Sequence, residues 1–408
     1  GAGARGGPAG AGPGRTAVPT LSRALVQAVR EGDDSDSDSE GGGAGGGGFG
    51  RVEREDEAAL REAEAVTEED ERALAAFGAK SAAPTRNLAD IIMAKLEESG
   101  GAGDGVDEGR PLLAGVRVPK GMDPRVAEMY VEVGKALSRY KSGKVPKAFK
   151  LIPSLSNWEE VLFLTEPDKW TPHAMFQATR LFASNLNAKM AQRFLNLVLL
   201  PRFRDDVRES KRVHHTLFMA LKKATYKPAA FYKGLLLPLC MSRTCTLREA
   251  VILSSIVSRS SIPVLHSCAA LLKIAQMPYS GTNSFFLRVL LDKRYALPYK
   301  VVDAVVEHFV SFEGDERVLP VVWHQALLTF CQRYKHEVTR EDKGRLHELC
   351  KAQKHHAITP EVHRELESSH SRGEEMTEQE RREKLASRKP FREDPADFPS
   401  FMCTEGEY

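Results

Sequence analysis

The stretch LFMALKKATYKPAAFYKG, from Leu217 to Gly234, has the periodicity that decides the fold. Apolar residues recur at helical spacing before Pro228, at Leu217, Leu221 and Ala224, and the same spacing joins Phe231 to Leu235 after it. A proline fits the first turn of a helix, where its missing N–H is not needed. The stretch therefore predicts two helices, with Pro228 at the start of the second.

The same stretch interleaves aromatic rings with lysines, which is typical of two different surfaces. Lysines among aromatic residues can grip nucleic acid, or they can lie on the solvent side of helices whose rings point inward. Because the rings follow the apolar spacing, we place all three in the core and the lysines outside. The rings are those of Tyr226, Phe231 and Tyr232.

Helix starts and turns are well marked between residues 122 and 370. A capping side chain before a proline, and a Ser or Thr three residues before Glu, both predict helix starts. These signals are Asp123-Pro124, Thr171-Pro172, Thr359-Pro360, Ser156…Glu159, Thr246…Glu249 and Thr377…Glu380. Prolines mark the expected turns at Pro201, Pro228, Pro238, Pro263, Pro278, Pro298 and Pro320, and Pro228, Pro263 and Pro298 share one spacing. Helix pairs repeated at such a spacing are typical of HEAT-like arrays, although no shared residue pattern accompanies it and coincidence remains an alternative.

Composition divides the 408 residues into four parts. Residues 1–85 hold Gly/Ala and Asp/Ser tracts that bury too little to fold, which predicts a disordered acidic arm. Residues 86–121 contain a short amphipathic helix with Leu88, Ile91, Ile92 and Leu96 on its apolar stripe, plus a linker. That helix folds either onto a partner groove or onto its own chain. Residues 122–370 form the α-helical domain, and 371–408 form a charged tail.

Charge is distributed very unevenly along the chain. Residues 111–300 contain 30 Lys and Arg against 12 Asp and Glu, whereas residues 1–110 contain 12 against 22. A folded block with this excess of positive charge favours a polyanionic partner, above all nucleic acid. We hypothesise that the acidic flanks shield the basic block until a partner displaces them.

No motif in the sequence predicts catalysis, a metal or a cofactor. The six cysteines do not form a Cys-x-x-Cys pair and lie mostly in apolar patterns, which predicts reduced core thiols. The nearest approach to a metal cluster, His347 and Cys350 with His355 and His356, lacks ligand spacing. No segment is long and apolar enough for a spanning helix, so we expect no membrane contact.

Two groups of basic residues are candidates for RNA contact. Lys141, Lys144, Lys147 and Lys150 recur every third residue in a turn-rich segment, so they line one edge. The weaker candidates are Arg202, Arg204, Lys222, Lys223, Lys227 and Lys233. With the rings buried, such a surface favours structured RNA recognised by shape. Phosphorylation candidates are Ser35, Ser37 and Ser39, within continuous acidic residues that equally suit a plain spacer.

Long stretches of the chain resemble one protein family. RYKSGKVPKAFKLIP, QATRLFASNLNAKMAQRFLNLVLLPRFRDDV, MALKKATYKPAAFYKGLLLPLC and LPVVWHQALLTFCQRYK are similar to the bystin family over about residues 86–370. The resemblance implies a HEAT-like protein of the nucleolus and nucleus that shuttles to the cytoplasm and serves maturation of small-subunit rRNA. It further implies contact with pre-rRNA, a ribosomal protein of the subunit head and other assembly factors of the 40S precursor, without enzymatic activity.

We therefore expect an all-α, HEAT-like helical array (an α-solenoid), preceded by a long disordered N-terminal arm. Its expected function is that of a non-catalytic ribosome biogenesis factor that binds pre-rRNA and partner proteins. The alternative is a protein–protein adaptor in cell adhesion or the cytoskeleton, whose lysines only keep it soluble.

Overall fold

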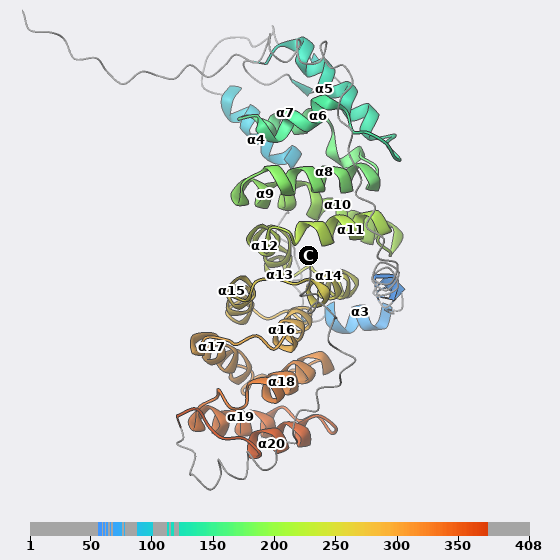
Figure 1. Ribbon diagram of the computed structural model, residues 1–408. Helices are drawn as coiled ribbons and strands as arrows, with labels where there is room; N and C mark the ends of the chain where they lie inside the picture. Colours follow the sequence, from blue (N-terminus) through green and yellow to red (C-terminus); the bar gives the residue numbers. More distant parts are fainter. Residues whose placement is uncertain are drawn as a thin grey trace, which may run out of the picture. The chain divides into compact units, whose positions relative to one another are not determined.

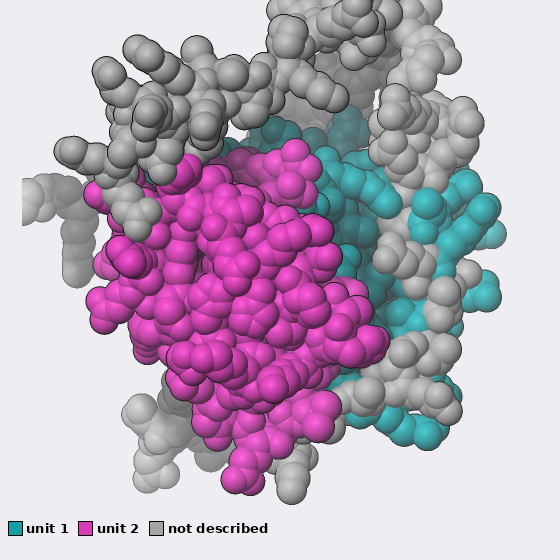
Figure 2. All heavy atoms as spheres, turned by 90° about the horizontal axis from the view of Figure 1, so that it is seen from below, with its two compact units in different colours: residues 1–293 teal, residues 294–408 magenta. Residues whose placement is uncertain are grey.

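The computed structural model describes most of the chain from Asp56 to Gly373, and the described part is almost entirely helical (Figure 1). The only strands in that part, β1 (Leu112–Leu113) and β2 (Val116–Arg117), pair as a short antiparallel hairpin. Two compact units, residues 1–293 and 294–408, are coloured separately in Figure 2. The described residues are 56–58, 60, 61, 63, 66, 68–75, 77, 88–100, 112, 113, 116, 117 and 122–373.

Two of the three predicted proline-led helix starts are confirmed. In α5 (Pro124–Leu137) the Asp123 carboxylate accepts from the Arg125 N–H at 3.0 Å, and α8 (Pro172–Asn185) is capped by Thr171 in the same manner. At α20 (Thr359–Glu367) the prediction is one residue off, because Ile358 is the N-cap. The Thr359 hydroxyl accepts instead from the His355 N–H at 2.9 Å.

Of the predicted capping boxes, the one at α14 (Leu247–Arg259) is confirmed. The Thr246 hydroxyl accepts from the Glu249 N–H, and the Glu249 carboxylate accepts from the Thr246 N–H at 2.7 Å. The box at Ser156 is wrong: α7 (Trp158–Leu164) has Asn157 as its N-cap, and the Glu159 carboxylate pairs with Arg193. The box at Thr377 lies outside the described residues.

Pro201 and Pro238 do not end helices, contrary to the prediction. Each follows a π-helical turn inside a continuous helix. A proline lacks the N–H for the helical ladder and its ring crowds the carbonyl four residues earlier, and a π-turn relieves both by widening the helix. The two composite helices consist of α9 (Ala188–Phe194), η3 (Leu195–Leu199) and α10 (Leu200–Ser210), and of α12 (Pro228–Phe231), η4 (Tyr232–Leu236) and α13 (Leu237–Ser242).

Within each unit, helices two places apart along the chain pack on one another. If each composite helix is counted once, α8 packs on α11, α9 on α12, α11 on α14, α13 on α15 and α14 on α16. In the second unit α17 packs on α19, and α18 on α20. This pattern is typical of stacked helix pairs, so the predicted HEAT-like array is confirmed. The remaining bounds are α11 (His215–Ala224), α15 (Val264–Ala275), α16 (Asn283–Asp292), α17 (Tyr299–Val310), α18 (Val321–Tyr334) and α19 (Arg340–Ala352).

The evenly spaced prolines coincide with this pairing. Pro228 opens α12, Pro263 is the N-cap of α15, and Pro298 is the N-cap of α17. Each therefore stands at the start of the first helix of a pair. The shared spacing reflects the length of one helix pair with its loops.

Two segments that precede the array are folded against it. The expectation of a disordered arm through residue 85 is wrong over α3 (Glu68–Ala75), which packs on α14 (Figure 1). The amphipathic helix, α4 (Leu88–Gly100), packs on α7 and buries Leu88 and Ile92. Of the two alternatives left open for this helix, the structure has the one in which it docks on its own chain. Residues 1–55 and 374–408, with Ser35, Ser37 and Ser39, lie outside the described residues.

Candidate nucleic-acid interface

The four lysines of the first candidate group form one exposed surface, which we call the lysine turn (Lys141, Lys144, Lys147 and Lys150). All four side chains are exposed to solvent. Lys141 and Lys144 lie in the loop after α5, and the other two lie three residues apart on α6 (Lys147–Leu151). The structure therefore places the whole group where a phosphate backbone can reach it.

The loop part of the lysine turn is held in a fixed shape by polar contacts. Gly143 has a φ of +101°, a conformation that residues with a side chain rarely adopt, and its carbonyl accepts from the Tyr140 hydroxyl. The Thr171 hydroxyl donates to the Tyr140 carbonyl at 2.6 Å, which ties the loop to the start of α8. The loop presents its lysines from a rigid base.

The helical part of the lysine turn is held by one aromatic side chain. Phe149 is fully buried and makes edge contacts with Trp170, at 5.3 Å between ring centroids, and with Phe182, at 5.8 Å. This short helix continues into η1 (Ile152–Ser154), and Trp170 follows η2 (Pro167–Lys169). Because Phe149 points inward, Lys147 and Lys150 on the other face point to solvent.

The end of α5 and the turn after it add two basic residues that the sequence analysis missed. Lys135 and Arg139 are exposed and directly precede the loop of the lysine turn. The available signal was their nearness in sequence to Lys141, since Lys135 lies in the last turn of α5 and Arg139 in the turn that follows it.

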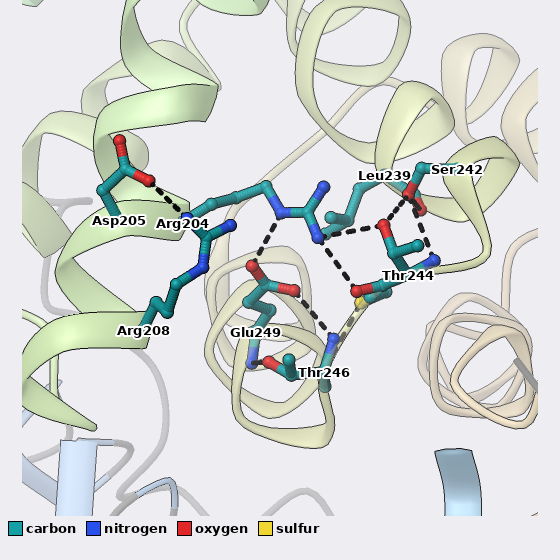
Figure 3. Close-up of polar contacts among 9 residues, drawn as sticks. Arg204, Asp205, Arg208, Leu239, Ser242, Thr244, Thr246 and Glu249 are labelled. Atoms are coloured by element: carbon teal, nitrogen blue, oxygen red, sulfur yellow. Dashed lines mark hydrogen bonds and ion pairs between the residues drawn. The ribbon is translucent and has the colours of Figure 1, made fainter. Parts of the chain in front are cut away.

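Arg204 is a structural residue, which corrects its assignment as an RNA contact (Figure 3). Its guanidinium donates to the Glu249 carboxylate at 2.9 Å and to the carbonyl and hydroxyl of Thr244, at 2.9 and 3.0 Å. The side chains of Arg204 and Glu249 are only 12% and 3% exposed. Burial raises the pKa of Glu249, and Arg204 opposes that rise. The pair joins α10 to α14 and is closed to a polyanion.

Arg202 is also a poor RNA contact. It is half-buried next to Asp168, whose pKa is raised by burial and by Asp205, while Arg202 lowers it. Its Nε is buried without a hydrogen-bond partner among the described residues. Because the Asp168 carboxylate already interacts with Arg202, the structure does not favour the assignment.

Of the four lysines of the Leu217–Gly234 stretch, two are already engaged within the chain and two are not engaged in ion pairs that the structure describes. Lys222 pairs with Asp56 at 2.8 Å, and Lys227 donates to the Leu186 carbonyl, so both already have partners within the chain. Lys233 is exposed, and the half-buried Lys223 lies over the Tyr226 ring, 4.8 Å from its centroid. In Figure 1 α11 and α12 lie below α8 and α9, which lie between them and α6.

The prediction that all three rings of this stretch are buried is wrong for one of them. Leu217, Leu221, Ala224, Phe231 and Tyr232 are in the core as predicted, but Tyr226 is 64% exposed. It lies in the loop between α11 and α12, beyond the last buried turn, so helical spacing no longer controls its direction. An exposed ring beside a lysine can stack on an unpaired base.

The thiols and histidines of the described residues give no sign of a catalytic or metal site. Cys240, Cys331 and Cys350 are buried free thiols, and burial raises the pKa of Cys350 to about 11, which keeps the thiol protonated and weakly nucleophilic. His347 and His363 lie with their Nδ1 atoms 2.7 Å apart, but in the part of the chain that the structure describes no three potential ligands converge on one point. None of the described helices is long and apolar enough to cross a membrane.

Stacked helix pairs that carry a lysine-rich turn define the class of this protein as an all-α repeat protein with a cationic surface. The chain belongs to the bystin family, whose model matches residues 82–376. It is 56% identical to bystin of Homo sapiens over 313 residues, which cover 76% of this chain and 71% of that protein. It is 52% identical to bystin of Arabidopsis thaliana over 320 residues, which cover 78% and 70%. Bystin of Nematostella vectensis is 56% identical over 307 residues, covering 75% and 70%.

Proposed function

We propose that this chain is a non-catalytic ribosome biogenesis factor that binds pre-rRNA in precursors of the small (40S) subunit and is required for maturation of the small-subunit rRNA. Membership of the bystin family supports the biogenesis role. The observation that carries RNA binding is the lysine turn, four exposed lysines on a base held by Phe149 and Thr171.

Such a factor acts by occupying a site and delaying a contact, so it needs a rigid cationic surface rather than reactive groups. The proposed partners are pre-rRNA, a ribosomal protein of the subunit head and other assembly factors of the precursor. The proposed location is the nucleolus and nucleus, with shuttling to the cytoplasm. Tyr226, with Lys223 over its ring, forms a smaller contact that suits an unpaired base, and Lys233 is an exposed lysine of the same stretch.

The salt dependence of RNA binding tests this function. Replacing all four residues of the lysine turn with Glu removes four phosphate contacts. The slope of log K against log salt should become shallower by about 3 to 4, because each contact contributes about 0.7 to 0.9. The assay is a fluorescence-anisotropy titration of labelled small-subunit pre-rRNA fragments between 50 and 200 mM salt (about the range over which such slopes are resolved).

A matched control reverses the same number of charges elsewhere. Lys273, Lys300, Lys351 and Lys354 are exposed lysines outside the lysine turn, and their replacement with Glu should leave most of the affinity and slope in place. Equal losses in both variants would mean that net charge alone drives binding. Background-level RNA binding by the unaltered protein would instead favour the adaptor alternative, for which affinity for a protein partner should depend little on salt.

A further inference from the structure

A short acidic segment of the N-terminal region lies on a second basic surface of the first unit. We call it the acidic strap, and it comprises the described residues from Asp56 to Phe77, including α3. In Figure 1 α3 lies beside α14, remote in sequence from it. This surface is separate from the lysine turn, which α5 and α6 carry.

Three basic side chains are neutralised by two carboxylates of the strap. Asp56, whose side chain is 4% exposed, lies 2.8 Å from the Lys222 ammonium and 3.7 Å from the Arg259 guanidinium. Glu71 accepts from the Arg248 Nε at 3.0 Å, and Arg248 also donates to the Val66 carbonyl at 2.6 Å. Because these cations are largely shielded from water, whatever replaces the strap has to supply negative charge again.

More cationic groups lie directly beneath the strap. A cavity of about 440 Å³ lies between part of α3 and the block. Lys211 and Arg243 line it on the side of the block, together with the hydroxyl residues Thr244, Thr246, Ser280 and Thr282. The Nε of Arg243 is buried and has no hydrogen-bond partner among the described residues. Guanidinium and hydroxyl groups around an open space suit phosphate oxygens.

The strap depends on contacts with the block that charged groups dominate. Its helix has eight residues, too few to be stable alone, so it depends on its contacts with the block. Apolar contacts of the strap include Leu74 against Gly281, where an added Cβ would lie 2.9 Å from the Leu74 Cγ, and the Phe77 ring against Tyr279. The ion pairs of the strap with Lys222, Arg248 and Arg259 are contacts that a polyanion can replace one for one.

We propose that Lys222, Arg248 and Arg259, with Lys211 and Arg243, form a second binding site for RNA phosphates, and that the acidic strap covers it in the free protein. This inference rests on the proposed function, because RNA held at the lysine turn is the polyanion that competes with the strap. The strap then acts as an internal competitor: it suppresses weak, non-specific contacts, and only an RNA that also engages the lysine turn displaces it.

The test is to neutralise the strap carboxylates in the full chain. Asp56→Asn with Glu71→Gln should raise RNA affinity on the order of tenfold at low salt, and should make the slope of log K against log salt steeper by about 2 to 3, as expected for about three new phosphate contacts. The matched control is Glu313→Gln with Glu316→Gln. It removes the same charge from exposed side chains outside the strap and its cavity, and the affinity should stay within about twofold.

A second variant displaces the strap without changing any charge. In Gly281→Val the added side chain meets Leu74, to which the three atoms nearest the new Cβ all belong, so the strap is pushed away. The same gain in RNA affinity is expected. Adding Arg248→Gln to either variant should reduce the gain, because it removes one of the uncovered cations.

The outcomes separate this inference from the proposed function. RNA binding by the unaltered protein with no gain in the Asp56/Glu71 and Gly281 variants overturns the second site and leaves the function standing. A gain equal to that of the Glu313/Glu316 control overturns it too, because net charge would then explain the effect. If those variants gain affinity for an acidic peptide but not for RNA, the surface binds protein and the inference is wrong. Background binding by every variant overturns both.

Discussion

Replacing Arg204 with Ala tests whether this arginine holds the fold or binds RNA. The substitution removes the positive partner of the Glu249 carboxylate, which is 3% exposed. It also removes the guanidinium that donates to the carbonyl and the hydroxyl of Thr244. Breaking a buried ion pair from one side costs about 3 to 5 kcal/mol, because the remaining charge stays buried and uncompensated. The free energy of unfolding should fall by that amount.

Urea unfolding followed by far-ultraviolet circular dichroism at pH 7 (about neutral) measures the change. Arg208→Ala is the control, since Arg208 is 72% exposed and pairs with the exposed Asp205, and it should change stability by less than about 1 kcal/mol. The double variant Arg204→Ala with Glu249→Gln should recover part of the loss, because no charge is then stranded, and it should bind RNA as the unaltered protein does.

The pH dependence of the stability loss in Arg204→Ala tests whether the unpaired Glu249 carboxylate causes it. Burial raises the pKa of Glu249, and removing Arg204 takes away the charge that opposes the rise. A carboxyl whose pKa is higher in the folded state binds protons on folding, so the loss of stability should be largest at neutral pH and should shrink as pH falls toward the usual range for Glu. A loss below about 1 kcal/mol at pH 7, or a tenfold drop in RNA affinity in the double variant, would refute the structural assignment.

Three further predictions follow from single side chains. Gly234→Ala should destabilise the first unit by about 1 to 3 kcal/mol in thermal unfolding, because the new Cβ would lie 2.7 Å from the Gln192 carbonyl oxygen. Its control, Gly344→Ala, places a Cβ with nothing within 4 Å and should stabilise the protein by about 0.5 to 1 kcal/mol. Tyr226→Ala should weaken binding of single-stranded RNA by about 1 to 3 kcal/mol, whereas Tyr226→Phe should keep the affinity because it keeps the ring. The two variants should have the same melting temperature, and equal RNA affinities of the two would exclude stacking on this ring. Burial lowers the pKa of His324 to about 4, so its imidazole takes up a proton more readily in the unfolded chain than in the folded one. The free energy of unfolding should therefore fall by about 2 kcal/mol between pH 7 and 5, and His324→Gln should flatten that dependence in equilibrium unfolding.

The sequence by itself determined the helical class of the fold and most of its helix starts. Apolar spacing and proline-led caps act within a few residues, so the helix starts at Pro124, Pro172 and Pro228 follow from local physics. The lysine turn belongs to this group as well, since Phe149 and Gly143 leave its lysines no direction but outward. Local rules misplace Pro201 and Pro238, because a π-turn accommodates each proline inside a helix.

Only the tertiary structure decided which charges are available. Arg204 and Lys222 look like the lysines of the lysine turn in the sequence, yet their partners Glu249 and Asp56 lie 45 and 166 residues away along the chain. Tyr226 shares the spacing of buried rings but lies beyond the last packed turn, where nothing covers most of it. Ion pairing and burial depend on which distant segments pack together, and the composition of a segment does not predict its distant neighbours. The acidic strap shows the same limit, because its low apolar content predicts disorder while the cations of α11 and α14 hold it in place.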